Sequence, residues 1–178
     1  MSDEDSSEVT VRVLGVGNVL MGDDGLGPYA VRVLESRYEM PDGVEVADAG
    51  TPGLDFAPFL AGTESVIVID TVSSDAAPGS VKLYRREQLL STPPPARTSP
   101  HQPGLRETIM AMELSGARVP EILLIGVVPG SVATGTGLSP AVHAAVDHAV
   151  GAAVGELRSL GRAPTVRSEP LPLDIWWE

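Results

Sequence analysis

The sequence predicts an α/β fold: a three-layer αβα sandwich around a mostly parallel, twisted sheet with one antiparallel edge strand. Short apolar runs rich in β-branched residues alternate with segments of helical periodicity, which is typical of this class. The run Ser65–Ile69 is almost continuously β-branched, as expected of a central parallel strand that is buried on both faces. The connection from this run to the next strand, Ser80–Tyr84, is too short for a parallel crossover. We therefore expect Ser80–Tyr84 to be the antiparallel strand at the sheet edge.

The first part of the chain supplies the opening strands and helices of this sandwich. Alternating or continuous apolar residues indicate strands, and apolar residues at helical spacing indicate helices. On these grounds we expect, in order, a strand over Val9–Leu14, a helix over Asp24–Arg37, a strand over Val44–Ala47 and a short helix over Leu54–Leu60.

The second part begins with a loop and ends with a long helix. Four prolines within Thr92–Pro100 exclude regular structure there, so we expect an extended loop. Ser139 and Pro140 suit the N-cap and the first position of a helix. The remaining expected elements are a helix over Gly104–Leu114, a strand over Ile122–Val128 and a helix from Pro140 to about Leu160.

Composition and charge narrow the possible functions of this 178-residue chain. We expect a disordered acidic arm over residues 1–8, a single domain over 9–161 and a proline-rich tail over 162–178. The formal net charge of -12 argues against a nucleic-acid partner. Without cysteine, the chain has no disulfide, thiolate ligand or cysteine nucleophile. No apolar run is long enough to span a membrane and the start is acidic, so we expect a cytoplasmic protein.

The tail carries an apolar cluster of three neighbouring residues, Ile175, Trp176 and Trp177. Such a cluster is costly to leave exposed in water. We expect it to dock on its own domain or on a neighbouring chain.

The glycine-rich segment Gly15–Pro28 joins the first strand to the first helix and superficially resembles a dinucleotide-binding turn. Asp23 and Asp24, however, lie where the helix should begin. The start of a helix attracts anions, and two carboxylates there would repel a pyrophosphate. This segment therefore suits a cation better than a nucleotide.

Acidic residues follow the predicted strands at the edge where α/β sheets place their ligand sites. Asp23 and Asp24 follow the first strand, Asp48 the second and Asp70 the third, and the proline-rich loop delivers His101. Carboxylates with one imidazole form a ligand set suited to zinc, nickel, cobalt, manganese or iron. The sequence therefore nominates a metal site at this edge.

Structural roles are also open for most of these residues. Asp23 or Asp24 can cap a helix, Asp48 can close an Asx turn, and a single loop histidine such as His101 is often merely exposed. Asp70 favours a functional role, because a carboxylate at the end of a buried strand is costly unless it is paired or coordinated.

In combination these segments resemble the hydrogenase maturation endopeptidases, which process the large subunit of nickel–iron hydrogenases. The similarity runs from about Val11 to about Leu160, and the segments occur in the family's order. The matching segments are Gly15–Asn18, Asp23–Gly27, Asp48–Gly53, Ile69–Asp70, Ser99–Gln102 with Gly104–Leu105, Gly126–Pro129 and Leu138–Val142.

The resemblance implies that Asp24, Asp70 and His101 contact a metal, and that Asp24, Asp48 and Asp70 take part in catalysis. It implies an aspartyl-type endopeptidase that removes a C-terminal extension from a nickel-loaded hydrogenase large-subunit precursor. The precursor would supply the nickel as the element that is recognised, and no organic cofactor is expected.

The chemistry of the cleavage step stays open at this point. A metal held by the trio can polarise the scissile carbonyl or acidify a water. Alternatively, Asp48 or Asp23 can act as general base while the metal only positions the bond. A non-catalytic metal-binding module and a nucleotide-binding protein are the alternative functions.

Overall fold

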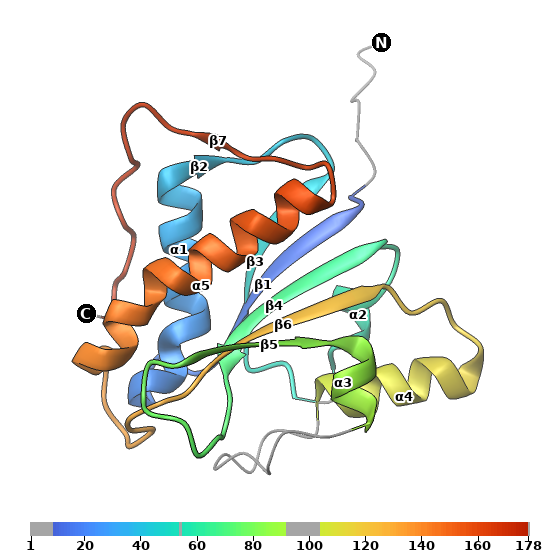
Figure 1. Ribbon diagram of the computed structural model, residues 1–178, viewed down its shortest axis with the longest axis horizontal. Helices are drawn as coiled ribbons and strands as arrows, with labels where there is room; N and C mark the ends of the chain where they lie inside the picture. The colour runs from blue at the N-terminus through green and yellow to red at the C-terminus, as the bar shows by residue number, and fades with distance from the viewer. Residues whose placement is uncertain (1–8, 54, 92–103, 178) are drawn as a thin grey trace.

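The computed structural model describes residues 9–53, 55–91 and 104–177, and its centre is a five-stranded sheet (Figure 1). The order is β3-β1-β4-β6-β5, in which all neighbouring strands are parallel except β5, which runs antiparallel to β6. The predicted fold class, with its antiparallel edge strand, is confirmed. The strands are β1 (Val11–Val16), β3 (Val44–Gly50), β4 (Ser65–Thr71), β5 (Val81–Arg85) and β6 (Glu121–Val127).

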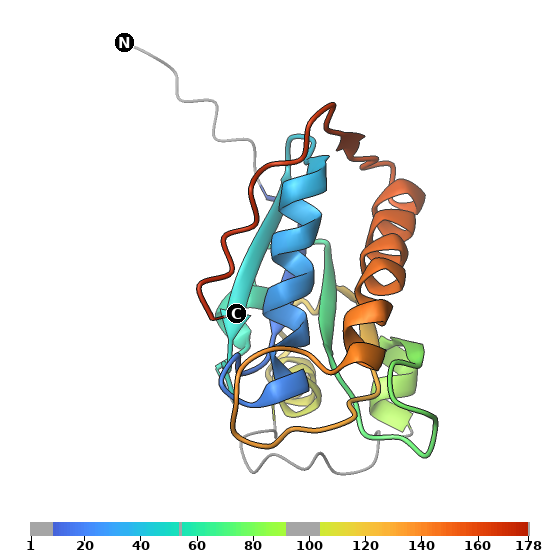
Figure 2. The ribbon, with the colours of Figure 1, turned by 90° about the vertical axis from the view of Figure 1, so that its left-hand side faces the viewer.

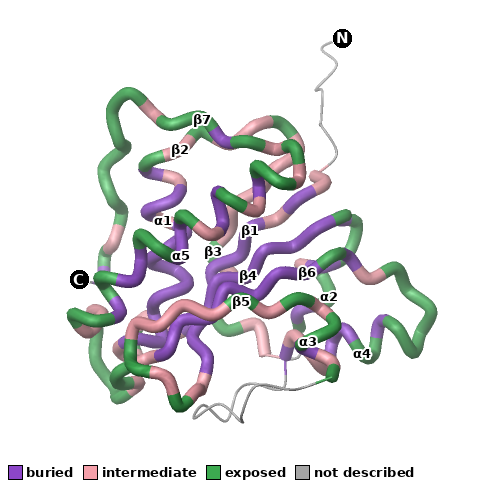
Figure 3. The backbone as a smooth tube through the Cα atoms, viewed as in Figure 1, coloured by how far each residue is buried: buried purple, intermediate pink, exposed green. Residues whose placement is uncertain are grey.

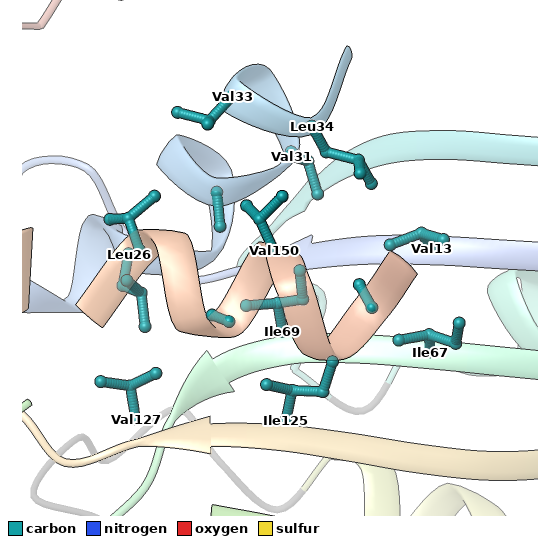
Figure 4. Close-up of a cluster of buried hydrophobic side chains, with 14 of the residues drawn as sticks. Val13, Leu26, Val31, Val33, Leu34, Ile67, Ile69, Ile125, Val127 and Val150 are labelled. Atoms are coloured by element: carbon teal, nitrogen blue, oxygen red, sulfur yellow. The ribbon is translucent and has the colours of Figure 1, made fainter. Parts of the chain in front are cut away.

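Helices cover both faces of this sheet, and each face has its own apolar core. One face carries α1 (Leu26–Arg37) and α5 (Pro140–Ser159), and the other carries α2 (Ala57–Leu60), α3 (Arg86–Ser91) and α4 (Leu105–Ser115). Figure 4 shows part of the first core, in which Ile67 and Ile69 of β4 lie with Val150 of α5. All residues of β4 are buried, as predicted for a central strand (Figure 3).

An ion pair fastens the edge strand β5 to helix α5. Arg85 donates to the two carboxylate oxygens of Glu156 at 2.5 and 2.8 Å. These hydrogen bonds to Glu156 raise the pKa of the Arg85 guanidinium above its ordinary value. An arginine is already fully protonated near neutral pH, so this contact stays intact across the physiological range.

Helix α1 approaches the sheet so closely that only glycine fits between them. A Cβ atom on Gly27 would lie 2.2 Å from the carbonyl oxygen of Val16 and 2.5 Å from that of Ile69. A Cβ atom on Gly15 would lie 2.3 Å from the carbonyl oxygen of Gly27. Because backbone atoms cannot rotate away, these glycines set the distance from α1 to β1 and β4.

Replacing Gly27 by alanine is therefore expected to lower the free energy of unfolding by about 3 kcal/mol, the upper end of typical overpacking costs. Gly155 offers a matched control, because it is also helical but has no atom within 4 Å of a built Cβ. Gly155→Ala should raise stability by up to about 1 kcal/mol through helix propensity. Urea denaturation measures both, and equal stability of the two variants would contradict this account of the packing.

The structure adds elements that the sequence did not predict. Helix α3 follows β5 directly, and β2 (Tyr38–Glu39) pairs antiparallel with β7 (Thr165–Val166) as a second, two-stranded sheet. The expected acidic arm over 1–8, the loop Thr92–Pro100 and His101 lie outside the described residues. Within the described parts of the chain, no helix is long and apolar enough to cross a membrane.

The C-terminal segment after β7 runs along α1, as Figure 2 shows. The amide of Arg167 donates to Arg37 O, and the amide of Leu171 donates to Ser36 O, both at 2.9 Å. Trp177 is buried, whereas Trp176 is 71% exposed. Of the two expected alternatives for the apolar cluster, its own domain or a neighbouring chain, the structure shows the first for Ile175 and Trp177, whereas Trp176 faces solvent.

Candidate active site

Two buried carboxylates lie at the carboxyl end of the central parallel strands. Asp24 belongs to the short 3-10 helix η1 (Gly22–Gly25) between β1 and α1, and it is 7% exposed. Asp70 is the penultimate residue of β4 and is 3% exposed. Because β1 and β4 are parallel neighbours, their carboxyl ends meet at the same edge of the sheet. The structure thus brings these two predicted site residues together.

Both carboxylates bind the same residue, Thr71. The Thr71 hydroxyl donates to Asp24 Oδ1 at 3.0 Å, and the Thr71 amide donates to Asp70 Oδ1 at 2.6 Å. The amide of Asn18 donates to the other oxygen of Asp24 at 2.9 Å. No described lysine or arginine forms an ion pair with Asp24. Two buried carboxylates that share the contact residue Thr71 offer oxygen ligands of the kind that bind divalent cations.

Asp23 faces the opposite way and binds the loop that leads into α5. Its Oδ2 accepts from the amides of Gly130 and Ser131 at 2.7 and 2.9 Å, and from the Ser139 hydroxyl at 2.9 Å. Its Oδ1 accepts from the Ser139 amide at 2.6 Å. Ser139 occupies the predicted N-cap position, but its hydroxyl donates to Asp23 and makes no capping hydrogen bond to the helix. These contacts give Asp23 a structural role in holding the loop before α5.

Asp23→Asn is expected to lower the free energy of unfolding by about 2–3 kcal/mol, because the amide NH₂ would face an N–H donor in either orientation. Asp147→Asn is the matched control, because Asp147 makes a 2.6 Å ion pair with Arg37 while its side chain is 70% exposed. The control should lose less than about 1 kcal/mol. Chemical denaturation compares the two, and a loss at Asp23 no larger than that of the control would refute the anchoring role.

Asp48 lies inside β3 and not after it, because β3 continues to Gly50 where the sequence predicted an end at Ala47. Asp48 is exposed, and its Oδ1 accepts from the Gly50 amide at 2.9 Å, as in an Asx turn. The amide of Gly17 donates to Gly50 O at 2.8 Å, which ties this turn to the glycine-rich segment. Asp48 therefore lies on the strand next to the glycine-rich segment, opposite Gly15, and its side chain is exposed.

The proposed third ligand, His101, lies outside the described residues. Among the residues that are described, no group of three or more histidine, aspartate or glutamate side chains is placed to hold a metal ion. The chain is described again from Gly104, where a built Cβ would lie 2.7 Å from the carbonyl oxygen of Gly53. Since Gly53 follows β3, helix α4 begins beside the loop at the carboxyl end of that strand.

Sequence reasoning did not identify Thr71 or Asn18 as parts of the site. Thr71 directly follows Asp70, but its hydroxyl finds Asp24 only because β1 and β4 are neighbours. Asn18 contributes its main-chain amide, and its side-chain oxygen accepts from the Leu20 amide at 3.0 Å. Every residue except proline has a main-chain amide, so the residue type at position 18 does not reveal this contact. Asn18 was recognisable only as part of the glycine-rich segment.

Comparison with known proteins identifies the family to which this site belongs. The family model of the hydrogenase maturation proteases matches residues 28–156. The hydrogenase 2 maturation protease of Escherichia coli K12 is 36% identical over 156 residues, covering 85% of this chain and 92% of that protein. The hydrogenase expression/formation protein HupD of Rhodobacter capsulatus is 36% identical over 152 residues, covering 85% of this chain and 72% of that protein.

Solved structures agree with the sequence comparison. The hydrogenase maturating endopeptidase HybD from Escherichia coli superposes with a TM-score of 0.79 at 34% identity, covering 89% of this chain and 98% of that one. The maturation protease HybD from Thermococcus kodakarensis gives a TM-score of 0.63 at 32% identity, covering 81% and 96%. The chain therefore belongs to the hydrogenase maturation protease family and is a hydrogenase maturation endopeptidase.

Proposed function

We propose that this endopeptidase removes a C-terminal extension from the large-subunit precursor of a nickel–iron hydrogenase after nickel has been inserted. The observation that carries the proposal is the buried pair Asp24 and Asp70, held together through Thr71 at the carboxyl end of the sheet. Paired carboxylates are oxygen ligands that suit a divalent cation, so this pair can bind a cation that arrives with the substrate.

The ligand chemistry of this edge suits nickel that is still bound to the precursor. Carboxylate and imidazole donors bind borderline divalent ions, and the chain has no cysteine to add a softer ligand. Nickel in the precursor brings ligands of its own. Asp24, Asp70 and His101 then need only complete the coordination, which would make cleavage conditional on nickel insertion.

Cleavage also needs an activated water and stabilisation of the tetrahedral oxyanion. Asp23 is already engaged by four donors, so Asp48 is the better candidate for a general base. Asp48 is exposed beside the glycine-rich segment, where its carboxylate can meet an incoming peptide and a water. The bound nickel would then position the scissile bond or polarise its carbonyl.

Mass spectrometry of the cognate large subunit tests this function. In a strain that carries the gene for this chain, the subunit should lose the mass of a C-terminal peptide, and in a deletion strain it should keep that mass. An unprocessed subunit in both strains would favour the alternative of a non-catalytic metal-binding module. Loss of mass from the N-terminus would contradict the proposed substrate site.

A further inference from the structure

Thr71 is buried at the end of β4 and forms hydrogen bonds with both acids of the site. It ends β4, is 5% exposed and lies between the two acids of the site. Its two hydrogen-bond donors go to different carboxylates: the hydroxyl to Asp24 at 3.0 Å and the amide to Asp70 at 2.6 Å. Any residue supplies the amide, but only a hydroxyl side chain supplies the contact to Asp24.

The hydroxyl determines how the Asp24 carboxylate is turned. Asn18 donates to Oδ2 and Thr71 to Oδ1, so one donor holds each oxygen. Two donors on different oxygens prevent rotation about the bond to the carboxylate carbon, whereas a single donor does not. A carboxylate has about four acceptor positions, and these two donors occupy two of them. The remaining lone pairs therefore point in a fixed direction.

We infer that Thr71 is a positioning residue for substrate recognition: its hydroxyl orients the Asp24 carboxylate toward the metal that Asp70 also binds. The hydrogen bonds are observed in the structure, whereas the presence of the metal depends on the proposed function. Donors that orient a metal-binding side chain typically change metal affinity or activity by about 10- to 100-fold when they are removed.

Two substitutions separate the hydroxyl from the rest of the side chain. Thr71→Val keeps the shape and the β-branched character of threonine, and Thr71→Ser keeps the hydroxyl. Thr63→Val is the matched control, because Thr63 is 4% exposed and donates to Leu60 O at 2.9 Å in another part of the fold. Thr71→Ala, compared with Thr71→Ser, repeats the test with smaller side chains in case valine prevents folding.

The first readout needs no metal. The amide of Asn18 reports on Asp24, because it donates to that carboxylate. In Thr71→Val its NMR signal should shift and its hydrogen exchange should accelerate, whereas Thr71→Ser and Thr63→Val should leave both as in the wild type.

The second readout is titration of the purified proteins with Ni²⁺ alone, and the third is processing of the nickel-loaded precursor. Thr71→Val should raise the Kd for Ni²⁺ by roughly tenfold and raise KM more than it lowers kcat. Thr71→Ser should restore both to within about twofold of the wild type, because the hydroxyl is retained. Thr63→Val should lose stability only.

The outcomes distinguish this inference from the proposed function. An unchanged Asn18 signal together with wild-type Ni²⁺ affinity in Thr71→Val, or failure of serine to restore them, would overturn the positioning role. If Asp70→Asn stops processing while Thr71→Val behaves as wild type, the proposed function stands and the inference is wrong. If Asp70→Asn binds Ni²⁺ and processes the precursor normally, the proposed function fails, and the Asn18 signal still decides whether the hydroxyl orients Asp24.

Discussion

Replacing Asp70 by asparagine is expected to slow precursor processing by about 10³-fold and to leave the fold intact. Asparagine has nearly the same shape, and its side-chain oxygen can still accept from the Thr71 amide. The substitution removes the negative charge that the substrate nickel would meet. Loss of a ligand should exceed the roughly 10- to 100-fold effect of losing a residue that only supports one. A time course of mature and precursor subunit measures the rate.

The control for this prediction is Asp75→Asn, the same substitution at an exposed position five residues later. It should process the precursor at the wild-type rate. His101→Ala should show the same loss of activity as Asp70→Asn, because both side chains belong to the proposed trio. Circular dichroism and urea denaturation should show that all three variants fold. Processing by Asp70→Asn at more than about a tenth of the wild-type rate would leave a ligand role for Asp70 without support.

Local composition was enough to predict the centre of the fold. The β-branched run at 65–69 predicted a strand buried on both faces, and all of β4 is buried. The short connection to β5 predicted its antiparallel direction, because the length of chain alone decides which crossovers are possible. Both inferences depend on local sequence, and both are confirmed.

Elements that depend on distant contacts escaped prediction. The strands β2 and β7 have two residues each and pair Tyr38 with Val166, so neither has a periodic pattern of its own. Strand β3 extends beyond its expected end because its pairing with β1 continues through a register shift between Gly15 and Val16. Such pairing depends on the neighbouring strand and is not encoded in local composition.

The site was predictable in part. The sequence could not distinguish the roles of two adjacent acids. Asp70 could be singled out because burying a carboxylate at a strand end is costly without a partner. Asp23 and Asp24 are chemically identical neighbours, so residue type alone could not separate their roles. The structure separates them by direction: Asp23 binds the loop before α5, and Asp24 binds Thr71 at the end of β4.

Nickel dependence is the largest effect that the proposed function predicts. A protease with a resident catalytic metal usually holds it with three protein ligands. Here the nominated set has two carboxylates and one imidazole, and it is proposed to complete the coordination of an ion that the precursor already binds. Nickel-free precursor should therefore stay uncut, and adding Ni²⁺ or Zn²⁺ to the purified endopeptidase should not change that result.

The most direct measurement is the mass of the cognate large subunit after incubation with the purified endopeptidase, using precursor from nickel-replete and from nickel-depleted cells. Asp70→Asn run in parallel shows that any cleavage comes from this site. The account predicts loss of the C-terminal peptide from the nickel-replete precursor alone, with or without added metal. Efficient cleavage of the nickel-depleted precursor, either directly or after Ni²⁺ or Zn²⁺ is added to the endopeptidase, would contradict it.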